Sequence, residues 1–358
     1  MTEVVHVITG LGTGGAERML VQLSIALRAR GISQHVVVLT GQDALAYDLR
    51  AAGMDLTILG ASSLASFPAA MLALVHLVGR KRPRIIQGWM YHGNLAATIC
   101  HYLCRGRRDR KLFWNLRASN MDDKRYGRLI WWSGLLSRSA DIVVANSEAG
   151  LAFHRERGFR PKRVAVIDNG INTEKFCPAP AIREKVRAEL GIPEDAVVVI
   201  NVARVDPMKD HANFLAAMAQ VPEVFGIMVG DGTQELSAPP NVRALGLQRD
   251  SERLLAAADI VASTSAFGEG FSNVIAEGMS AGLVPVATDV GDAWRIIGDI
   301  GWIVAPGDSA AFARAIGEVA ALPASERRRR GVVARERIIA KFTLAQAADA
   351  FAKLYAPG

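Results

Sequence analysis

Short runs of β-branched residues alternate with amphipathic segments along almost the whole chain, and this alternation constrains the fold more than any other feature. The segment at 15–30 has helical periodicity and ends before Gly31, a residue typical of helix C-termini. Strands that alternate with helices predict a parallel sheet with helices on both faces. In the first half the predicted strands are 4–8, 35–40, 55–59, 84–88, 111–116, 141–145 and 163–167.

The pattern breaks at residues 168–180 and then restarts. The break, DNGINTEKFCPAP, is rich in turn-forming residues and has no periodicity. A chain of 358 residues is long enough for two domains. We therefore expect two Rossmann-like domains, 1–170 and 171–340, and a helix after Thr343. The second set of predicted strands is 196–202, 224–229, 241–245, 259–263, 284–288 and 301–304.

Charge is distributed unevenly between the two halves. Residues 1–170 hold 23 Lys and Arg against 12 Asp and Glu, a net +11, and the remainder holds 19 against 23, a net −4. The first half is therefore expected to meet an anionic partner. Nucleic acid is not indicated, because the basic residues do not interleave with aromatic residues and no nucleic-acid-binding motif is present.

Cysteine content and the N-terminal sequence indicate a cytoplasmic location. Three cysteines suit a reducing compartment, and no charged region followed by an apolar stretch opens the chain. Cys100, His101 and Cys104 lie within about one turn of a predicted helix. A zinc site would need further ligands at matching spacing, so we interpret the two cysteines as buried small residues and expect no metal.

The stretch VVHVITGLGTGGAERMLVQL, residues 4–23, contains the pattern G-x-G-x-x-G after a strand. A nicotinamide-binding unit also needs an acidic residue at the end of its second strand, to bind the ribose hydroxyl. Here that strand ends with Thr40 and Gly41, and Asp43 comes late, which disfavours a dehydrogenase. The backbone N–H groups around Gly14 and Gly15 at a helix start can still bind an anion. A tight turn without a ligand is the alternative.

Two glutamates seven residues apart are the most informative feature of the second half. In STSAFGEGFSNVIAEGMSAGLVPVATDVG, Glu269 lies in a predicted loop and Glu277 within a predicted helix at 273–281. The N–H groups of Phe271, Ser272 and Asn273 would point from the helix start toward an anion. This patch suits a sugar nucleotide, because carboxylates accept from hydroxyls and N–H groups donate to a diphosphate.

Two cations follow a predicted buried strand in NVARVDPMKDH. Arg204 comes directly after the strand, and Lys209 comes five residues later at a predicted helix start. Cations at the carboxyl end of a sheet strand suit a diphosphate. A solvated loop would explain the pair equally well.

Taken together, these stretches resemble the retaining GT-B glycosyltransferases of family 4. The E-x7-E element with its preceding E-G-F is the specific signal, and the resemblance covers nearly the whole chain. It implies two Rossmann-like domains facing each other across a cleft, with residues 341–358 crossing back to the first domain. The matching stretches are GLGTGGAER, QGWMYHGNLAA, WNLRASN, SADIVVANSEAG, VIDNGINTEKF, NVARVDPMKD, MVGDGTQ, ADIVASTSAFGEGFSNVIAEGMSAGLVPVATDVGD and GWIVAPGD.

The resemblance also implies roles for individual residues. Glu269 would contact donor-sugar hydroxyls and Glu277 the ribose. Arg204 and Lys209 would hold the diphosphate and neutralise the leaving group. The remaining implied donor-binding residues are Gly14 and Gly15 of the first loop, the backbone of Phe271, Ser272 and Asn273, and Gly246.

The chain departs from the family at the fifth strand. Many relatives place a histidine after it, pointing at the donor sugar, whereas LFWNLR delivers Arg117. Arg117 is a candidate catalytic residue that could bind a phosphate or another anionic group. The acceptor-side candidates are His92, Asn94 and Asn120, although His92 fits a locally satisfied loop histidine equally well.

The expected reaction is transfer of a hexose from a UDP- or GDP-linked donor to an acceptor hydroxyl, with retention. The chain contains no D-x-D motif, so neither a metal nor another cofactor is expected. The resemblance places this chemistry in bacterial polysaccharide, lipopolysaccharide or lipid-linked glycan synthesis. An epimerase or phosphorylase would need its own acid and base, which the sequence does not clearly supply. A non-catalytic sugar-nucleotide sensor would not keep the acceptor-side glycine loop.

The expected acceptor is a saccharide or lipid-linked saccharide at the inner face of the cytoplasmic membrane. Residues 63–84 combine an apolar helix with a basic end, and residues 105–111 add a second basic segment. Both fit peripheral contact with an anionic bilayer, although a core helix with a solvated end fits 63–84 equally well. For Trp131 and Trp132, core packing is favoured over an interfacial position.

Overall fold

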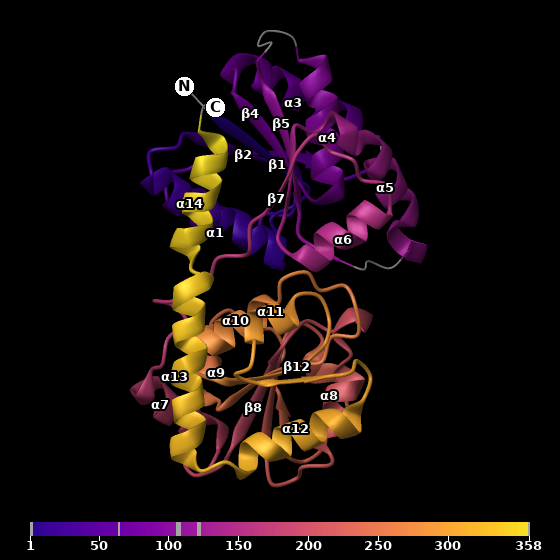
Figure 1. Cartoon of the computed structure of the whole chain (residues 1–358). Helices are drawn as coiled ribbons and strands as arrows, with labels where there is room; N and C mark the ends of the chain where they lie inside the picture. The colour runs from indigo at the N-terminus through magenta and orange to yellow at the C-terminus, as the bar shows by residue number, and fades with distance from the viewer. Residues whose placement is uncertain (1–2, 64, 105–108, 120–122, 357–358) are drawn as a thin grey trace. The chain divides into compact units, whose positions relative to one another are not determined.

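The computed structural model describes residues 3–63, 65–104, 109–119 and 123–356. The chain divides into two compact units, shown in Figure 1. Unit 1 comprises Met1–Gly170 and Leu344–Gly358, and unit 2 comprises Ile171–Thr343. Each unit is a parallel sheet covered by helices, as the alternating sequence pattern predicts.

Unit 1 contains a seven-stranded sheet in the order β3-β2-β1-β4-β5-β6-β7. Every neighbouring pair is parallel. All seven predicted strands form, with ends that shift by one or two residues. Their bounds are β1 Val4–Ile8, β2 Gln34–Thr40, β3 Asp55–Ala61, β4 Ile85–Trp89, β5 Lys111–Leu116, β6 Ile142–Ala145 and β7 Val164–Val166.

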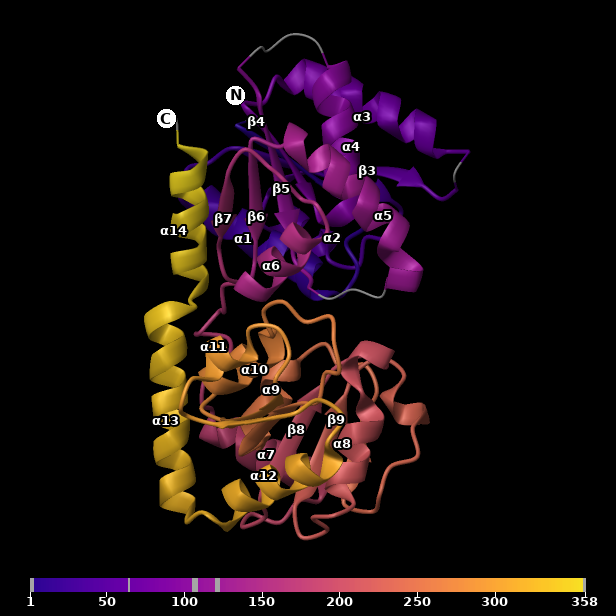
Figure 2. The ribbon, with the colours of Figure 1, turned by 45° about the vertical axis from the view of Figure 1, so that its right-hand side comes forward.

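Two groups of helices cover the two faces of this sheet (Figure 2). One face packs against α1, α2 and α14, and the other against α3, α4 and α5. Helix α14 packs against α1 and buries Phe351 and Tyr355, so the C-terminal segment crosses back to the first domain as expected. The helices are α1 Gly15–Ala29, α2 Ala46–Ala51, α3 Phe67–Lys81, α4 Met90–Leu103, α5 Asp123–Leu136, η1 Ser137–Ser139, α6 Glu148–Glu156 and α14 Leu344–Tyr355.

Unit 2 contains a six-stranded parallel sheet in the order β10-β9-β8-β11-β12-β13. The six predicted strands are all present. They are β8 Val198–Val202, β9 Phe225–Val229, β10 Val242–Ala244, β11 Ile260–Ser263, β12 Val284–Thr288 and β13 Trp302–Val304. The helices are α7 Pro180–Leu190, η2 Pro207–Lys209, α8 His211–Met218, η3 Thr233–Glu235, α9 Ser251–Ala257, α10 Asn273–Ser280, α11 Ala293–Ile297, α12 Ser309–Ala321 and α13 Ala324–Lys341.

The strand order of each sheet reverses direction once. In unit 1 the chain moves outward from β1 to β2 and β3, and β4 then returns to the other side of β1. In unit 2, β11 pairs with β8 in the same way. Ligands of open parallel sheets bind outside the carboxyl ends of the strands at such a reversal. The loops after β1 and β4, and those after β8 and β11, are therefore where each unit should bind a ligand.

The expected core packing of Trp131 and Trp132 is wrong. Both side chains are 56 % exposed, while Ser133 and Gly134 of the same helix face inward. A Cβ atom on Gly134 would lie only 2.8 Å from the Arg157 carbonyl oxygen. The turn around Arg157 therefore approaches α5 too closely for a large side chain, and the indoles face outward.

Within the segment 63–84, residues Phe67–Lys81 form α3, which is basic at its end. One side of α3 is buried, through Ala70, Met71, Leu74 and Val78. Cys100 and Cys104 are both buried, and burial raises the pKa of the Cys100 thiol to about 12. In the described parts of the chain, no three His, Cys, Asp or Glu side chains gather as a metal site would require. None of the described helices has both the length and the apolar character of a membrane span.

Two buried histidines, His6 and His154, are neutral and make hydrogen bonds within the core of unit 1. His6 Nδ1 accepts from the Trp89 indole N–H at 3.1 Å, so Nε2 carries the proton and donates to Gln34 Oε1 at 3.0 Å. His154 Nδ1 donates to the Gly150 carbonyl at 2.6 Å, and Nε2 accepts from the Tyr91 hydroxyl at 2.8 Å. Burial lowers the pKa of each histidine to about 4.

Unit 1 should lose stability in mild acid because of these histidines. In the unfolded chain a histidine takes up a proton below about pH 6.5, whereas in the folded chain His6 and His154 stay neutral down to about pH 4. Stability is therefore fully present above pH 6.5 and falls between pH 6.5 and 4, by about 1.4 kcal/mol per pH unit for each histidine. Urea unfolding at pH 7 and pH 5, followed by tryptophan fluorescence, measures this loss.

The variant His6→Gln keeps one donor and one acceptor and should lose less stability between the two pH values. His76→Gln, at an exposed position on α3, is the matched control and should behave like the parent chain. Equal losses in the parent and in His6→Gln would contradict the role of His6.

Candidate functional site

The loops after β8 and β11 are joined at the carboxyl edge of the unit 2 sheet. Lys209, at the end of η2, forms an ion pair with Glu269 in the β11 loop. Two further bonds hold the loops together: the Thr264 hydroxyl donates to the Lys209 carbonyl at 3.0 Å, and the Ala266 amide donates to the Met208 carbonyl at 2.8 Å. The strand reversal thus brings together a cation and a carboxylate that are 60 residues apart.

Glu269 is held firmly in place. Its side chain is only 13 % exposed, and its Oε1 accepts from the Ser265 hydroxyl at 2.9 Å as well as from Lys209. A carboxylate fixed in this way can act as a hydrogen-bond acceptor for a ligand hydroxyl. Its oxygen shared with Lys209 and Ser265 is already engaged, which disfavours nucleophilic attack through that atom.

Arg204 lies at the same edge and projects into solvent. Its side chain is 59 % exposed and donates to Asp206 Oδ2 at 3.0 Å. Asp206 Oδ1 accepts from the Met208 amide at 3.0 Å and so caps η2. Burial opposes ionisation of Asp206, but the Met208 amide and Arg204 outweigh it and lower the pKa of this carboxyl. Arg204 is therefore positioned at its base and remains accessible to an anion.

The N-terminus of α10 follows directly after Glu269. Gly268 has φ +82° and Gly291 has φ +63°. A Cβ on Gly291 would clash with the Glu269 carbonyl oxygen, because the two atoms would be only 2.5 Å apart. Both glycines allow the loop to pass close to its neighbours. Among the described residues, no side chain caps α10 at Ser272, and the buried Ser272 hydroxyl has no hydrogen-bond partner. This helix start can offer N–H groups to an anion.

The other predicted donor-binding residues of unit 2 lie near this edge. Phe271 is buried and packs against Phe342 at a centroid distance of 5.5 Å, so only its backbone is suited to contact a ligand. Asn273 is the first residue of α10, and Glu277 is half-buried one turn further on. Gly246 follows β10 with φ +69°, and its carbonyl accepts from Gly230 at 2.8 Å. Gly246 thus shapes the turn beside the β8 loop.

In unit 1, the glycine loop leads from β1 into α1. Gly14 is the N-cap and Gly15 the first helical residue, and no side chain in the described structure caps this helix. The Glu17 carboxylate lies over Gly14, in the space that a Cβ would fill. At Gly10, the Gln42 side chain occupies the corresponding space, 2.7 Å from a Cβ. This loop therefore faces an amide and a carboxylate of its own chain.

His92 lies at the β4–α4 junction, beside the reversal of the unit 1 sheet. It is exposed, and partial desolvation lowers its pKa, which favours the neutral ring. Met90, two residues earlier, has φ +59°, a strained backbone for a residue with a side chain. At Gly93 a Cβ would lie 2.5 Å from the Val7 carbonyl oxygen. This close packing of α4 on β1 fixes the position from which His92 projects.

Asn94 is not placed where an acceptor could reach it, which corrects its assignment to the acceptor side. It is fully buried, and its amide pairs with the Asn115 backbone, accepting at 3.2 Å and donating at 3.4 Å. The side chain therefore joins α4 to β5. Asn120 lies outside the described residues.

Arg117 is buried beneath the C-terminal helix. Its side chain donates to Asn115 Oδ1 at 2.8 Å and to Asn169 Oδ1 at 2.5 Å. The guanidinium also lies 5.1 Å from the Trp89 ring centroid and 5.6 Å from that of Phe351. Burial lowers the pKa of Arg117 to about 9. These contacts favour a role in fastening α14 to the sheet over contact with a substrate.

Comparison with known proteins decides the family. Residues 13–175 match the family model described as Glycosyltransferase Family 4, and residues 196–321 match Glycosyl transferases group 1. The chain belongs to the family 4 glycosyltransferases. This glycosyltransferase is 27 % identical over 361 residues to the lipopolysaccharide core biosynthesis glycosyltransferase LpsE of Rhizobium meliloti, and the match covers 96 % of each chain.

Further relatives agree with this assignment. A D-inositol 3-phosphate glycosyltransferase of Streptomyces scabiei is 30 % identical over 216 residues, and the match spans 47 % of that enzyme's length. The crystal structure of Anabaena Alr3699/HepE in complex with UDP-glucose has the same fold, with a TM-score of 0.87, 23 % identity and 99 % of each chain covered. This glycosyltransferase therefore has the GT-B fold.

Three residues that shape the site were not among the sequence candidates. Asp206 was visible as an acid before a proline, a common start of a helical turn. Ser265 was visible only as a hydroxyl four residues before Glu269. The positive φ of Met90 leaves no signal in a single sequence, because it results from the packing of α4.

Removing either cation should slow glycosyl transfer. For Lys209→Ala and Arg204→Ala we expect a loss of about 100-fold or more in kcat/KM, since each removes positive charge where the leaving group develops negative charge. Lys185→Ala, on the exposed side of α7, is the control and should retain full activity. Product formation followed by mass spectrometry measures the effect, and near-normal rates in both site variants would disprove the assignment.

Replacing Arg117 should affect stability more than chemistry. Arg117→Met removes the guanidinium bonds to Asn115 and Asn169, so the free energy of unfolding should fall by about 2–4 kcal/mol. The turnover of the molecules that remain folded should change little. Arg128→Met, at an exposed position on α5, is the control. A 100-fold loss of turnover at unchanged stability would instead support a catalytic Arg117.

Proposed function

We propose that this glycosyltransferase moves a hexose from a UDP-hexose to a hydroxyl of a lipid-linked saccharide, with retention and without a metal. The observation that carries the proposal is the placement of Lys209 and Arg204 beside Glu269, at the strand reversal of the unit 2 sheet. A bound nucleoside diphosphate needs cations there, and the donor sugar needs a carboxylate that accepts hydrogen bonds from its hydroxyls.

Charge stabilisation is the main demand of the reaction. The diphosphate gains negative charge as the bond to the sugar breaks, and the sugar becomes oxocarbenium-like. Arg204, Lys209 and the N-terminus of α10 offer positive charge and N–H groups to the diphosphate. Glu269 offers its carboxylate to the sugar hydroxyls, and Glu277 would bind the ribose.

Retention at the anomeric carbon is proposed from the resemblance to the retaining family 4 glycosyltransferases, and the state of Glu269 bears on the route by which it would occur. A double displacement would need a free carboxylate as nucleophile, whereas Glu269 is engaged by Lys209 and Ser265. We therefore favour attack from the face that the diphosphate leaves. The acceptor oxygen bonds to the anomeric carbon, the bond to the phosphate oxygen breaks, and the acceptor proton passes to that phosphate.

The donor and acceptor classes follow from the relatives. HepE was crystallised with UDP-glucose and with UDP and glucose, which supports a UDP-linked hexose. LpsE, which aligns with this chain from end to end, acts in lipopolysaccharide core biosynthesis, which supports a saccharide acceptor carried on a lipid. Because Arg204 and Lys209 would supply positive charge to the diphosphate and the sequence has no D-x-D motif, we expect turnover without a divalent cation.

A donor panel tests the proposal. The purified enzyme is incubated with UDP-glucose, UDP-galactose, UDP-N-acetylglucosamine and GDP-mannose, with lipopolysaccharide core acceptors. We expect transfer from a UDP-hexose, an α-linked product by NMR, and no loss of rate in EDTA. A β-linked product would contradict retention, loss of rate in EDTA would contradict metal independence, and use of GDP-mannose alone would replace the donor.

A further inference from the structure

The outward sides of α4 and α5 carry large apolar side chains. On α4 these are Ile99, Tyr102 and Leu103, at 42 %, 65 % and 62 % exposure. On α5 they are Trp131, Trp132 and Leu135, at 56 %, 56 % and 52 %. The two helices are in contact with each other, and the spacing in each places these residues along one stripe. We call these six residues the α4–α5 apolar face.

Helix α5 leaves its two largest side chains exposed. Its inward side presents Ile130, Ser133 and Gly134, while its outward side presents the two indoles. Helices of globular proteins normally turn their apolar stripe toward the core. An exposed apolar surface of this kind marks a site of interaction with a partner.

A cationic surface adjoins this face through η1. The Arg160 amide donates to the Ser137 hydroxyl at 2.8 Å, and the Lys162 amide donates to the Ala140 carbonyl at 3.3 Å. These two bonds place residues 160–162 beside the end of α5, so the two surfaces are neighbours.

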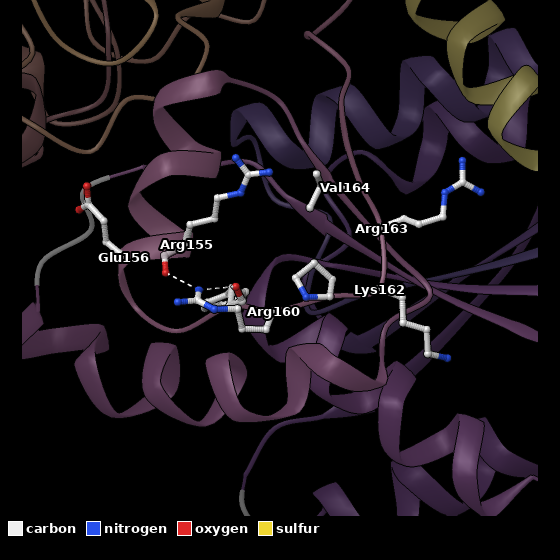
Figure 3. Close-up of a pocket in the computed structure, with 8 residues that line it drawn as sticks. Arg155, Glu156, Arg160, Lys162, Arg163 and Val164 are labelled. Carbon is white, nitrogen blue, oxygen red and sulfur yellow. Dashed lines mark hydrogen bonds between the residues drawn. The ribbon is translucent and has the colours of Figure 1, made fainter.

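The cationic surface contains an open pocket of about 590 Å³ between α6 and β7 (Figure 3). Arg155 and Arg163 extend on either side of Val164, and Arg160 is tied back to the Arg155 carbonyl at 2.7 Å. Glu156 is the one carboxylate among the residues that line it. The lining residues are Arg155, Glu156, Phe159, Arg160, Pro161, Lys162, Arg163 and Val164.

We propose that the α4–α5 apolar face and this cationic surface dock unit 1 on an anionic lipid bilayer. Tryptophan and tyrosine favour the region between lipid head groups and acyl chains, and arginine and lysine favour lipid phosphates. Charge complementarity selects the bilayer: a purely apolar partner would leave the arginines of the cationic surface unused. The surface differs from the predicted one, because α3 buries much of its apolar side against the sheet.

This inference deepens the proposed function, since a lipid-linked acceptor is met at a bilayer. Tyr102 lies ten residues after His92 on α4, which is about 15 Å along the helix. The α4–α5 apolar face therefore lies toward the end of α4 that leads into β5, away from His92 along the axis of the helix. The test measures binding without turnover, so failure of the proposed reaction would leave it intact.

Vesicle flotation tests the surface. The full chain is mixed with vesicles of phosphatidylcholine, or of phosphatidylcholine with phosphatidylglycerol, at low and high salt. We expect binding to the anionic vesicles at low salt. The double variant Trp131→Ser/Trp132→Ser should bind at least about 10-fold more weakly. The matched control is Trp294→Ser in unit 2, whose indole is 57 % exposed and which should bind normally.

A second pair of variants tests the charges. Arg138 is exposed on η1, beside the cationic surface, and Arg163 is exposed within it. Arg138→Gln/Arg163→Gln should weaken binding to anionic vesicles by about 30-fold, because each cation near such a surface contributes about 1 kcal/mol. Arg314→Gln/Arg328→Gln, at exposed positions of unit 2, has the same net charge as the first double variant but should bind like the parent chain. The difference between the pairs should shrink at high salt.

Three results would overturn the proposal. The tryptophan variant could bind vesicles as tightly as its Trp294→Ser control. The two arginine pairs could bind vesicles equally well. The parent chain could fail to bind vesicles and instead self-associate through the indoles, as sedimentation would show. Circular dichroism and a UDP-induced thermal shift show that each variant is folded. Activity of the tryptophan variant on a water-soluble acceptor separates loss of docking from loss of catalysis.

Discussion

The candidate donor site depends on one topological constraint, the reversal of strand order within a parallel sheet. In unit 2 this reversal makes β8 and β11 neighbours, so the loops that follow them meet at one edge. Lys209 and Glu269 form an ion pair across that meeting point, and backbone bonds from the same loops hold it in place. The sheet therefore fixes the position of this site, because the two loops that form it follow the neighbouring strands β8 and β11.

Unit 1 uses the same constraint with a different chemical content. Its reversal lies between β1 and β4, and the loops there present a glycine-rich helix start and His92. Around them the interior contains hydrogen-bonded polar groups: His6 bridges Trp89 and Gln34, and Arg117 joins two asparagines beneath α14. Buried polar groups of this kind specify one arrangement, because each unpaired partner would be costly. They hold the C-terminal helix on the first unit.

Unit 1 carries two distinct groups of exposed features. The carboxyl edge of its sheet carries the glycine-rich helix start and His92, whereas the apolar and cationic surfaces lie toward the ends of α4, α5 and α6. The excess positive charge of residues 1–170 is therefore not spread evenly: part of it gathers beside exposed indoles. Net charge alone indicated an anionic partner, and only the packing of α5 showed which side chains face it.

The sequence by itself determined the two units and the strands that the structure describes, because hydrophobic periodicity follows directly from burial in a parallel sheet. The crossing back of the final helix was expected from the family resemblance. It also marked Glu269, Arg204 and Lys209 through their local spacing. Tertiary structure alone decided that Arg117 and Asn94 are buried, that Lys209 pairs with Glu269, and that the indoles of α5 face outward. Each of these depends on contacts between segments far apart in the chain, such as the approach of Arg157 to Gly134, and a local pattern carries no record of such contacts.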